Sequence, residues 1–153
     1  MKPETLITHL IERGETVATA ESLTAGLVCA TLTEVPGSSA AVRGGLIVYA
    51  TDLKASLAGV DEALLAAHGA VHPEVAAQLA AGAKDRCGAT WGLGLTGVAG
   101  PAGQDGVALG TVHVGLAGPG TLTVRTLDLS GDRAAVRAGA VSGAFALLGE
   151  HLA

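Results

Sequence analysis

Ser22 and Lys54 are the two residues whose types and positions point most directly to catalysis. Ser22 stands where a β-branched segment, residues 16–20, turns into a helical segment, so its hydroxyl can be a nucleophile near a helix dipole. Lys54 is one of only three lysines, and a lysine whose pKa is lowered by burial can activate a serine hydroxyl. Each residue also has a plainer interpretation. Ser22 or Thr24 can be a helix N-cap, and Lys54 can be a solvated ammonium.

Two further segments end predicted strands in the same way. Tyr49 closes an apolar strand over residues 45–49, and its hydroxyl can bond the lysine or a substrate, or belong to the core. The glycine-rich segment 96–103 follows another predicted strand, and its backbone N–H groups can hold a phosphate or an oxyanion. It matches neither the dinucleotide fingerprint nor the P-loop pattern. Since ligands bind beyond the carboxyl ends of parallel strands, these segments predict one cleft.

Arg133 and Arg137 lie one turn apart at the start of the last predicted helix, directly after Asp132. Two guanidinium groups on one side of a helix can clamp a phosphate or a carboxylate. The alternative is a helix capped by Asp132 with both arginines in solvent.

Several other chemistries find no support in the residue pattern. The five histidines are scattered without metal-ligand spacing, so we expect no metal and no other cofactor. Cys29 and Cys87 form no CxxC motif, and we interpret both as reduced, buried thiols. Neither G-x-S-x-G nor S-x-x-K occurs at any serine, which argues against the familiar hydrolase and β-lactamase signatures.

The predicted helices and strands begin in the order αβαβααα, and the chain ends in a β-hairpin and a helix. The pattern predicts a mixed, mostly parallel five-stranded sheet with helices on both faces, hence an α/β fold. The apolar segment 45–49 does not alternate, which is typical of a strand covered on both faces. Predicted helices span residues 4–13, 25–34, 52–57, 61–68, 73–86 and 132–148, and predicted strands span residues 16–20, 45–49, 90–96, 111–116 and 121–129.

Composition narrows the class of protein further. A length of 153 residues suits a single domain over residues 1–153, and the one Trp, one Tyr and one Phe leave a core of small side chains. Such a core favours helices packed tightly on a sheet. The net charge of −5 and the lack of a basic run argue against nucleic acid. Without an apolar span or a signal peptide, we expect a cytoplasmic protein, and the Ala-rich helices favour a homodimer.

Taken together, short segments spread over nearly the whole chain resemble the CinA C-terminal domain family in order and spacing. They are AESLTAG (20–26), VPGSS (35–39), GGLIVY (44–49), Lys54, LAGV (57–60), HGAV (68–71), LTGVAGP (95–101) and GDR (131–133). The resemblance implies a three-layer α/β/α sandwich. It also implies an amidase that hydrolyses nicotinamide mononucleotide, a small-molecule nucleotide, to nicotinic acid mononucleotide and ammonia.

The resemblance places the family's functional residues on numbered positions of this chain. Ser22, Lys54 and Tyr49 take the catalytic positions, with Lys54 accepting the proton of Ser22 and N–H groups near residues 96–100 holding the oxyanion. The glycine-rich segment and an arginine would hold the nucleotide phosphate. Together with neighbouring positions, the expected substrate-binding residues are Thr24, Gly45, Thr96, Gly97, Ala99, Gly100, Arg133 and Arg137.

Three residues depart from the family pattern. Leu23 replaces a small residue and can narrow the pocket, Ala25 replaces a glycine, and His72 stands where Ser is common. Ala25 is harmless if it is helical and strains the backbone otherwise. These departures keep open a nucleotide-binding, competence-associated module without turnover, and an amidase for a related substrate. The larger N-terminal domain of many members, and any pyrophosphatase activity associated with it, is not expected here.

Overall fold

The structure is a computed structural model that describes residues 1–153, with six α-helices, one short 3-10 helix and five strands. The helices are α1 (Pro3–Arg13), α2 (Leu27–Thr33), α3 (Thr51–Ala58), α4 (Glu62–His68), α5 (Pro73–Cys87) and α6 (Arg133–Leu152), with η1 at Ser38–Ala40. The strands are β1 (Val17–Glu21), β2 (Val42–Ile47), β3 (Trp91–Gly97), β4 (Thr111–Gly118) and β5 (Thr121–Asp128).

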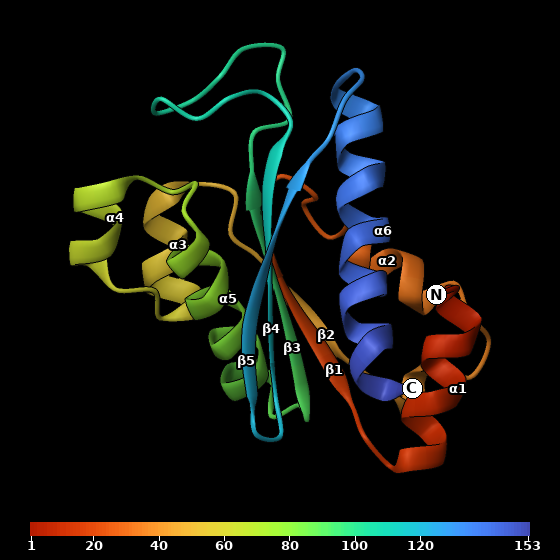
Figure 1. Cartoon of the computed structure of the whole chain (residues 1–153). Helices are drawn as coiled ribbons and strands as arrows, with labels where there is room; N and C mark the ends of the chain where they lie inside the picture. Colours follow the sequence, from red (N-terminus) through yellow and green to blue (C-terminus); the bar gives the residue numbers. More distant parts are fainter.

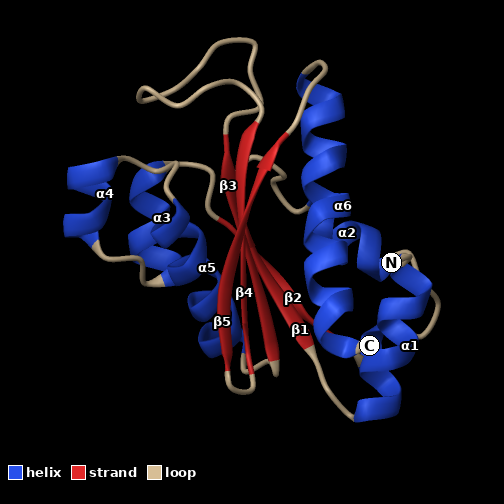
Figure 2. Cartoon of the chain, in the orientation of Figure 1, coloured by secondary structure: helices blue, strands red, loops and turns tan.

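The five strands form one mixed sheet in the order β2-β1-β3-β4-β5. β1 pairs in parallel with β2 and β3, whereas β4 is antiparallel to both β3 and β5. Four strands therefore point the same way and only β4 is reversed. α3, α4 and α5 cover one face of the sheet, and α1, α2 and α6 cover the other (Figures 1 and 2). The predicted α/β/α sandwich is confirmed.

The core has two apolar clusters, one on each side of the sheet. The larger has 23 buried residues and includes the inner faces of α1, α2 and α6. The smaller has 10 residues and lies beneath α3, α4 and α5. There α5 approaches the sheet so closely that a side chain at Gly94 or Gly115 would overlap the backbone of α5, which confirms the expected tight packing of small residues. None of the helices combines the length and the hydropathy that a membrane span needs.

Helix ends mostly follow the sequence signals. Pro73 begins α5, and the Asp61 and Asp132 side chains accept backbone N–H groups at the starts of α4 and α6. Gly59 ends α3 in a left-handed conformation. α3 begins at Thr51, one residue before the predicted start, and its N-cap, Ala50, makes no side-chain bond.

The structure corrects four other expectations. β2 is an edge strand whose residues alternate between half-buried and exposed, so it is not covered on both faces. α2 begins at Leu27 rather than at residue 25, because a turn intervenes. α6 continues to Leu152, four residues beyond the predicted end. Both cysteines are free, as expected, but half-buried rather than buried.

Candidate active site

Three parallel strands end at one edge of the sheet, and their last residues line one cleft. β1 lies between β2 and β3. The chain leaves β1 through α2 on one face and leaves β2 through α3, α4 and α5 on the other face (Figure 1). The segments after β1 and β2 therefore leave the sheet on opposite faces, and the cleft lies where they separate, beside the segment after β3. The predicted convergence of the three segments is confirmed.

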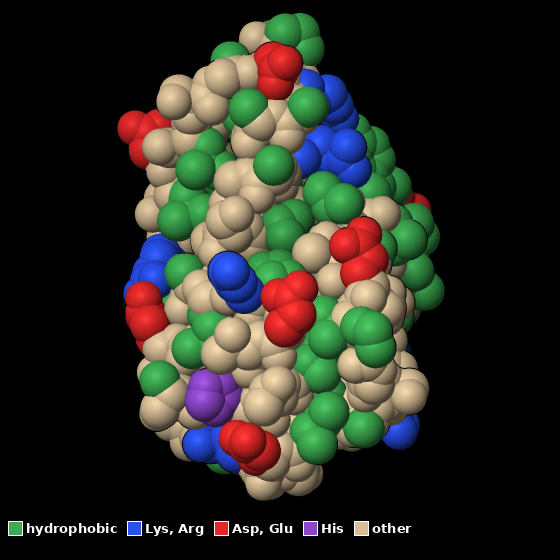
Figure 3. Space-filling view, turned by 90° about the vertical axis from the view of Figure 1, so that its right-hand side faces the viewer, with side chains coloured by type: hydrophobic (Ala, Val, Ile, Leu, Met, Phe, Trp, Pro, Cys, Tyr) green, Lys and Arg blue, Asp and Glu red, His purple; other side chains and the backbone are tan.

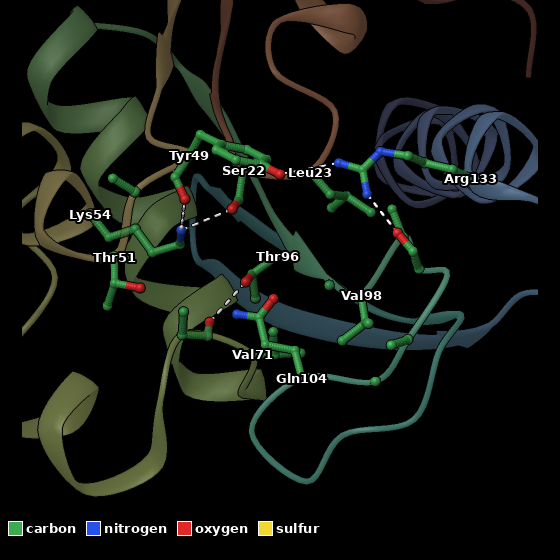
Figure 4. Close-up of a pocket in the computed structure, with 17 residues that line it drawn as sticks. Ser22, Leu23, Tyr49, Thr51, Lys54, Val71, Thr96, Val98, Gln104 and Arg133 are labelled. Carbon is green, nitrogen blue, oxygen red and sulfur yellow. Dashed lines mark hydrogen bonds between the residues drawn. The ribbon is translucent and has the colours of Figure 1, made fainter.

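The cleft has a volume of about 500 Å³, within the usual range for small-molecule sites. The loop between β3 and β4 and the first residue of α6 form its outer rim (Figure 4). Its polar side chains are contributed by Ser22, Tyr49, Thr51, Lys54, Thr96, Gln104 and Arg133, and its larger apolar ones by Leu23, Val71 and Val98.

Lys54 and Ser22 are paired at the buried end of the cleft. The Lys54 Nζ atom lies 2.8 Å from Ser22 Oγ, 2.8 Å from the Val48 carbonyl oxygen and 3.1 Å from the Tyr49 carbonyl oxygen. The lysine side chain is only 1% exposed, and no carboxylate pairs with it. Because burial penalises the ammonium form, the pKa of Lys54 falls to about 8. The lysine can therefore be neutral near physiological pH, as a general base must be.

Glu21 holds the helix that follows the serine. Its buried carboxylate accepts N–H groups of Val28 and Cys29, at 2.9 and 3.0 Å, and the Thr19 hydroxyl at 2.9 Å. The N-terminus of α2 is therefore satisfied by Glu21 and not by Ser22 or Thr24. Ser22 lies five residues before the start of α2, so it is not part of that helix's N-terminus. The cap interpretation of Ser22 is excluded, and the hydroxyl is free to face the cleft.

The turn between β1 and α2 is a strained segment. Ala25 has a φ of 49° and Gly26 a φ of 97°, both in the left-handed region. Ala25 is therefore not helical, and alanine carries a steric cost there that glycine would avoid. Arg137 lies against this turn. Its Nε donates to the Leu23 carbonyl oxygen at 2.9 Å and its Nη2 to that of Thr24 at 3.2 Å.

Arg133 bridges two sides of the mouth of the cleft (Figure 4). Its Nη1 donates to the Gly100 carbonyl oxygen at 2.7 Å and its Nη2 to the Tyr49 hydroxyl at 3.1 Å. Tyr49 is 59% exposed, so it is a rim residue and does not belong to the core. Its backbone carbonyl, not its hydroxyl, contacts Lys54.

The glycine-rich loop after β3 offers donors without partners. The backbone N–H groups of Ala99 and Gly100 donate to no acceptor within the chain, and neither does that of Leu23. All three residues line the cleft. The Thr96 hydroxyl donates to the Ala70 carbonyl oxygen at 2.8 Å, so it can act toward a ligand only as an acceptor.

The structure separates the predicted site residues into two groups. Ser22, Lys54, Tyr49, Thr96, Gly97, Ala99, Gly100 and Arg133 line the cleft. Thr24, Gly45 and Arg137, which were also predicted to bind the substrate, are not among the residues that line it. Thr24 is fully buried with an unpartnered hydroxyl. A side chain on Gly45 would meet Thr19 and Cys29 beside α2.

Sequence reasoning missed Glu21, Thr51 and Gln104. The clearest signal for Glu21 was an acidic side chain placed directly between a buried strand and a helix-forming segment. Gln104 lies in the glycine-rich segment between β3 and β4, where the residue pattern does not predict which side chains face the cleft.

No three His, Cys, Asp or Glu side chains converge in a way that could hold a metal ion. On the face covered by α1, α2 and α6, basic side chains form no continuous band (Figure 3).

Comparison with known proteins gives one consistent result. The family described as the CinA C-terminal domain matches residues 2–152. A CinA-like protein from Frankia casuarinae is 53% identical over 144 residues, which cover 94% of this chain and 33% of that protein. A CinA-like protein from Anaeromyxobacter is 48% identical and covers 95% of this chain and 36% of its own length. The chain thus spans about a third of the curated relatives it matches.

Two solved structures agree over nearly the whole chain. A competence-damaged protein (CinA) superfamily protein from Escherichia coli is 29% identical with a TM-score of 0.94, covering 97% of this chain and 87% of that one. A competence/damage inducible protein from Agrobacterium tumefaciens is 33% identical with a TM-score of 0.89. The match covers 98% of this chain and 94% of that one. The likeness therefore includes every element that builds the cleft.

Proposed function

The chain belongs to the CinA C-terminal domain family, and from that premise we propose that it is a serine amidase acting on nicotinamide mononucleotide. The products are nicotinic acid mononucleotide and ammonia, as in pyridine nucleotide recycling. One observation supports the proposal above all others. A buried lysine with a pKa of about 8 lies 2.8 Å from a serine hydroxyl in a small-molecule cleft.

The contacts of Lys54 suit a base rather than a fixed ammonium. A neutral amine has two N–H bonds and one lone pair. If the two N–H bonds donate to the carbonyl oxygens of Val48 and Tyr49, the lone pair is left for the hydroxyl proton of Ser22. The alkoxide of Ser22 then attacks the carboxamide carbon while Lys54 holds the proton.

The remaining steps use groups at the cleft wall. Unpartnered N–H groups of Leu23, Ala99 and Gly100 are the candidates for holding the oxyanion. When the C–N bond breaks, the proton on Lys54 passes to the leaving nitrogen, and ammonia departs from an acyl-Ser22 ester. A water molecule then attacks that ester, giving its proton to Lys54, which returns it to Ser22. The net reaction consumes one water and releases the acid and ammonia.

The cleft also suits a nucleotide. Arg133 at the rim has a guanidinium group that bridges two neutral oxygens, and a phosphate would bind it more strongly because the bond is charge-assisted. The walls formed by Val71 and Val98 suit a flat aromatic ring. The phosphate and the ring would then lie at opposite ends of the cleft, with the carboxamide toward Ser22.

The test is ammonia release from nicotinamide mononucleotide, nicotinamide riboside and free nicotinamide. We expect release from the mononucleotide, and a loss of at least about a thousandfold in Ser22→Ala. Ser142→Ala, an exposed serine on α6, is the matched control and should keep the wild-type rate. An unchanged rate in Ser22→Ala would contradict the proposal. Binding of the mononucleotide without ammonia would favour a non-catalytic nucleotide-binding module, and release only from another amide would identify a different amidase.

A further inference from the structure

We infer that Arg137 is a positioning residue, which holds the turn that carries Ser22 and does not touch the substrate. The inference rests on the proposed nucleophilic role of Ser22, although not on the identity of the substrate. Arg137 lies on the second turn of α6, one helical turn beyond the rim residue Arg133. The two arginines thus share a helix and a side-chain type but act on different parts of the site.

The contacts of Arg137 are all with the backbone of the turn. Its guanidinium group donates to the carbonyl oxygens of Leu23 and Thr24, and it pairs with no carboxylate. The Thr24 carbonyl also accepts the N–H group of Leu27. The Leu23 carbonyl has no other donor. Arg137 is therefore the only hydrogen-bond partner of the Leu23–Thr24 peptide unit, the second peptide unit after the residue bearing the nucleophile.

Few hydrogen bonds hold this turn beyond Ser22, whose own N–H group donates to the Leu95 carbonyl oxygen of β3. Between the last residue of β1 and the start of α2, the only turn-internal backbone bonds run from Ala25 N–H to the Ser22 carbonyl and from Leu27 N–H to the Thr24 carbonyl. The segment also passes through two left-handed residues, Ala25 and Gly26. A rigid, forked donor that spans two consecutive carbonyls restricts both peptide planes at once.

The consequence concerns both Ser22 and the N–H group of Leu23. If the turn shifts, the distance from Ser22 Oγ to Lys54 Nζ changes, and so does the position of a candidate oxyanion donor. Misplacement of reacting groups by about 1 Å can cost a hundredfold in rate. Loss of Arg137 should therefore slow bond formation at Ser22 while leaving the phosphate end of the cleft unaltered.

The experiment measures nucleophile reactivity and ligand binding separately. Wild type, Arg137→Met and Arg137→Lys are treated with a small fluorophosphonate, in which Ser22 Oγ bonds to phosphorus, fluoride leaves and Lys54 accepts the proton. The labelling rate constant is followed by mass spectrometry across pH. The dissociation constant for nicotinamide mononucleotide is measured by calorimetry on Ser22→Ala backgrounds, and kcat and KM are measured for ammonia release. Arg125→Met, which loses only an exposed ion pair between β5 and Glu150 of α6, is the matched control.

We expect Arg137→Met to lower the labelling rate and kcat by about tenfold to a hundredfold, with KM and the dissociation constant within about twofold of wild type. Arg137→Lys should recover part of the loss, because an ammonium can reach one carbonyl. The midpoint of the pH profile should stay near 8, since Lys54 is untouched. Arg125→Met should behave as wild type.

Two results would overturn the inference. If Arg137→Met is labelled at the wild-type rate, the turn does not depend on the arginine. If binding of the mononucleotide weakens while labelling is unchanged, Arg137 holds the phosphate. Should Arg137→Met fail to fold, Arg137→Lys decides by the same measurements. A wild type that is labelled at Ser22 but releases no ammonia refutes only the proposed substrate, whereas a wild type that is not labelled refutes the nucleophile and this inference with it.

Discussion

Lys54 Nζ lies 2.8 Å from Ser22 Oγ, and the lysine side chain that makes this contact is 1% exposed. Burial lowers its pKa to about 8. Because only the neutral amine can accept a proton, amidase activity should rise as the pH increases through about 8 and then level off. The measurement is kcat/KM for ammonia release between about pH 6.5 and 9.5. A profile that is flat or falls over this interval would contradict the role of Lys54 as base.

Lys54→Arg provides the control for this pH dependence. A guanidinium group keeps the positive charge but does not lose its proton in this pH range. We expect the rate to fall by about a hundredfold or more, and the rise near pH 8 to vanish. If the arginine variant kept the wild-type rate, a positive charge beside Ser22 would be sufficient and proton transfer to the lysine would be excluded.

Arg133 should contribute to binding of the phosphate group and not to bond breaking. We expect Arg133→Met to raise KM for nicotinamide mononucleotide by about tenfold or more, because a charge-assisted bidentate contact is lost. The value of kcat/KM for nicotinamide riboside, which has no phosphate, should change little. Equal losses for both substrates would show that Arg133 acts on something other than the phosphate.

Glu21 should matter for stability through the N-terminus of α2. In Glu21→Gln the amide can accept at only one atom, so one of the N–H groups of Val28 and Cys29 loses its acceptor. We expect the free energy of unfolding in urea at pH 7 to fall by about 2 kcal/mol. Glu34→Gln, an exposed position at the other end of α2, should change it by less than about 0.5 kcal/mol. Equal effects of the two substitutions would refute the capping role.

Ala25→Gly should stabilise the protein. Ala25 has a φ of 49°, and glycine adopts this conformation without the steric cost of a Cβ atom. We expect the free energy of unfolding to rise by about 0.5–1 kcal/mol. Ala30 is an exposed position inside α2. There Ala30→Gly should lower the free energy of unfolding by about 1 kcal/mol. Thermal or urea unfolding of the two variants tests both predictions. A destabilised Ala25→Gly variant would contradict the steric cost assigned to Ala25.

The layered fold, and the edge of the sheet at which the site lies, could be predicted from the order of the residues. These features depend on a few neighbouring residues, so short segments of sequence are enough to recognise them. They are the periodicity of apolar residues in helices and strands, the glycines that end helices, and capping residues such as Asp132. Residue types and positions alone made Ser22, Lys54 and the glycine-rich loop candidates, and the family resemblance added the amidase chemistry. Residue order alone also indicated that these segments end parallel strands and must therefore meet.

The contacts of each side chain, in contrast, could be assigned only from the three-dimensional structure. Ser22 is not a helix cap, because Glu21 reaches forward seven residues to take that role. Arg133 and Arg137 are equivalent in type and lie one turn apart, yet one faces the cleft and the other the turn behind it. The contacts of Lys54 with Ser22 and of Arg137 with Leu23 join residues that are 32 and 114 positions apart. The local residue pattern carries no information about contacts at such large sequence separations, because the packing of the helices on the two faces of the sheet determines them.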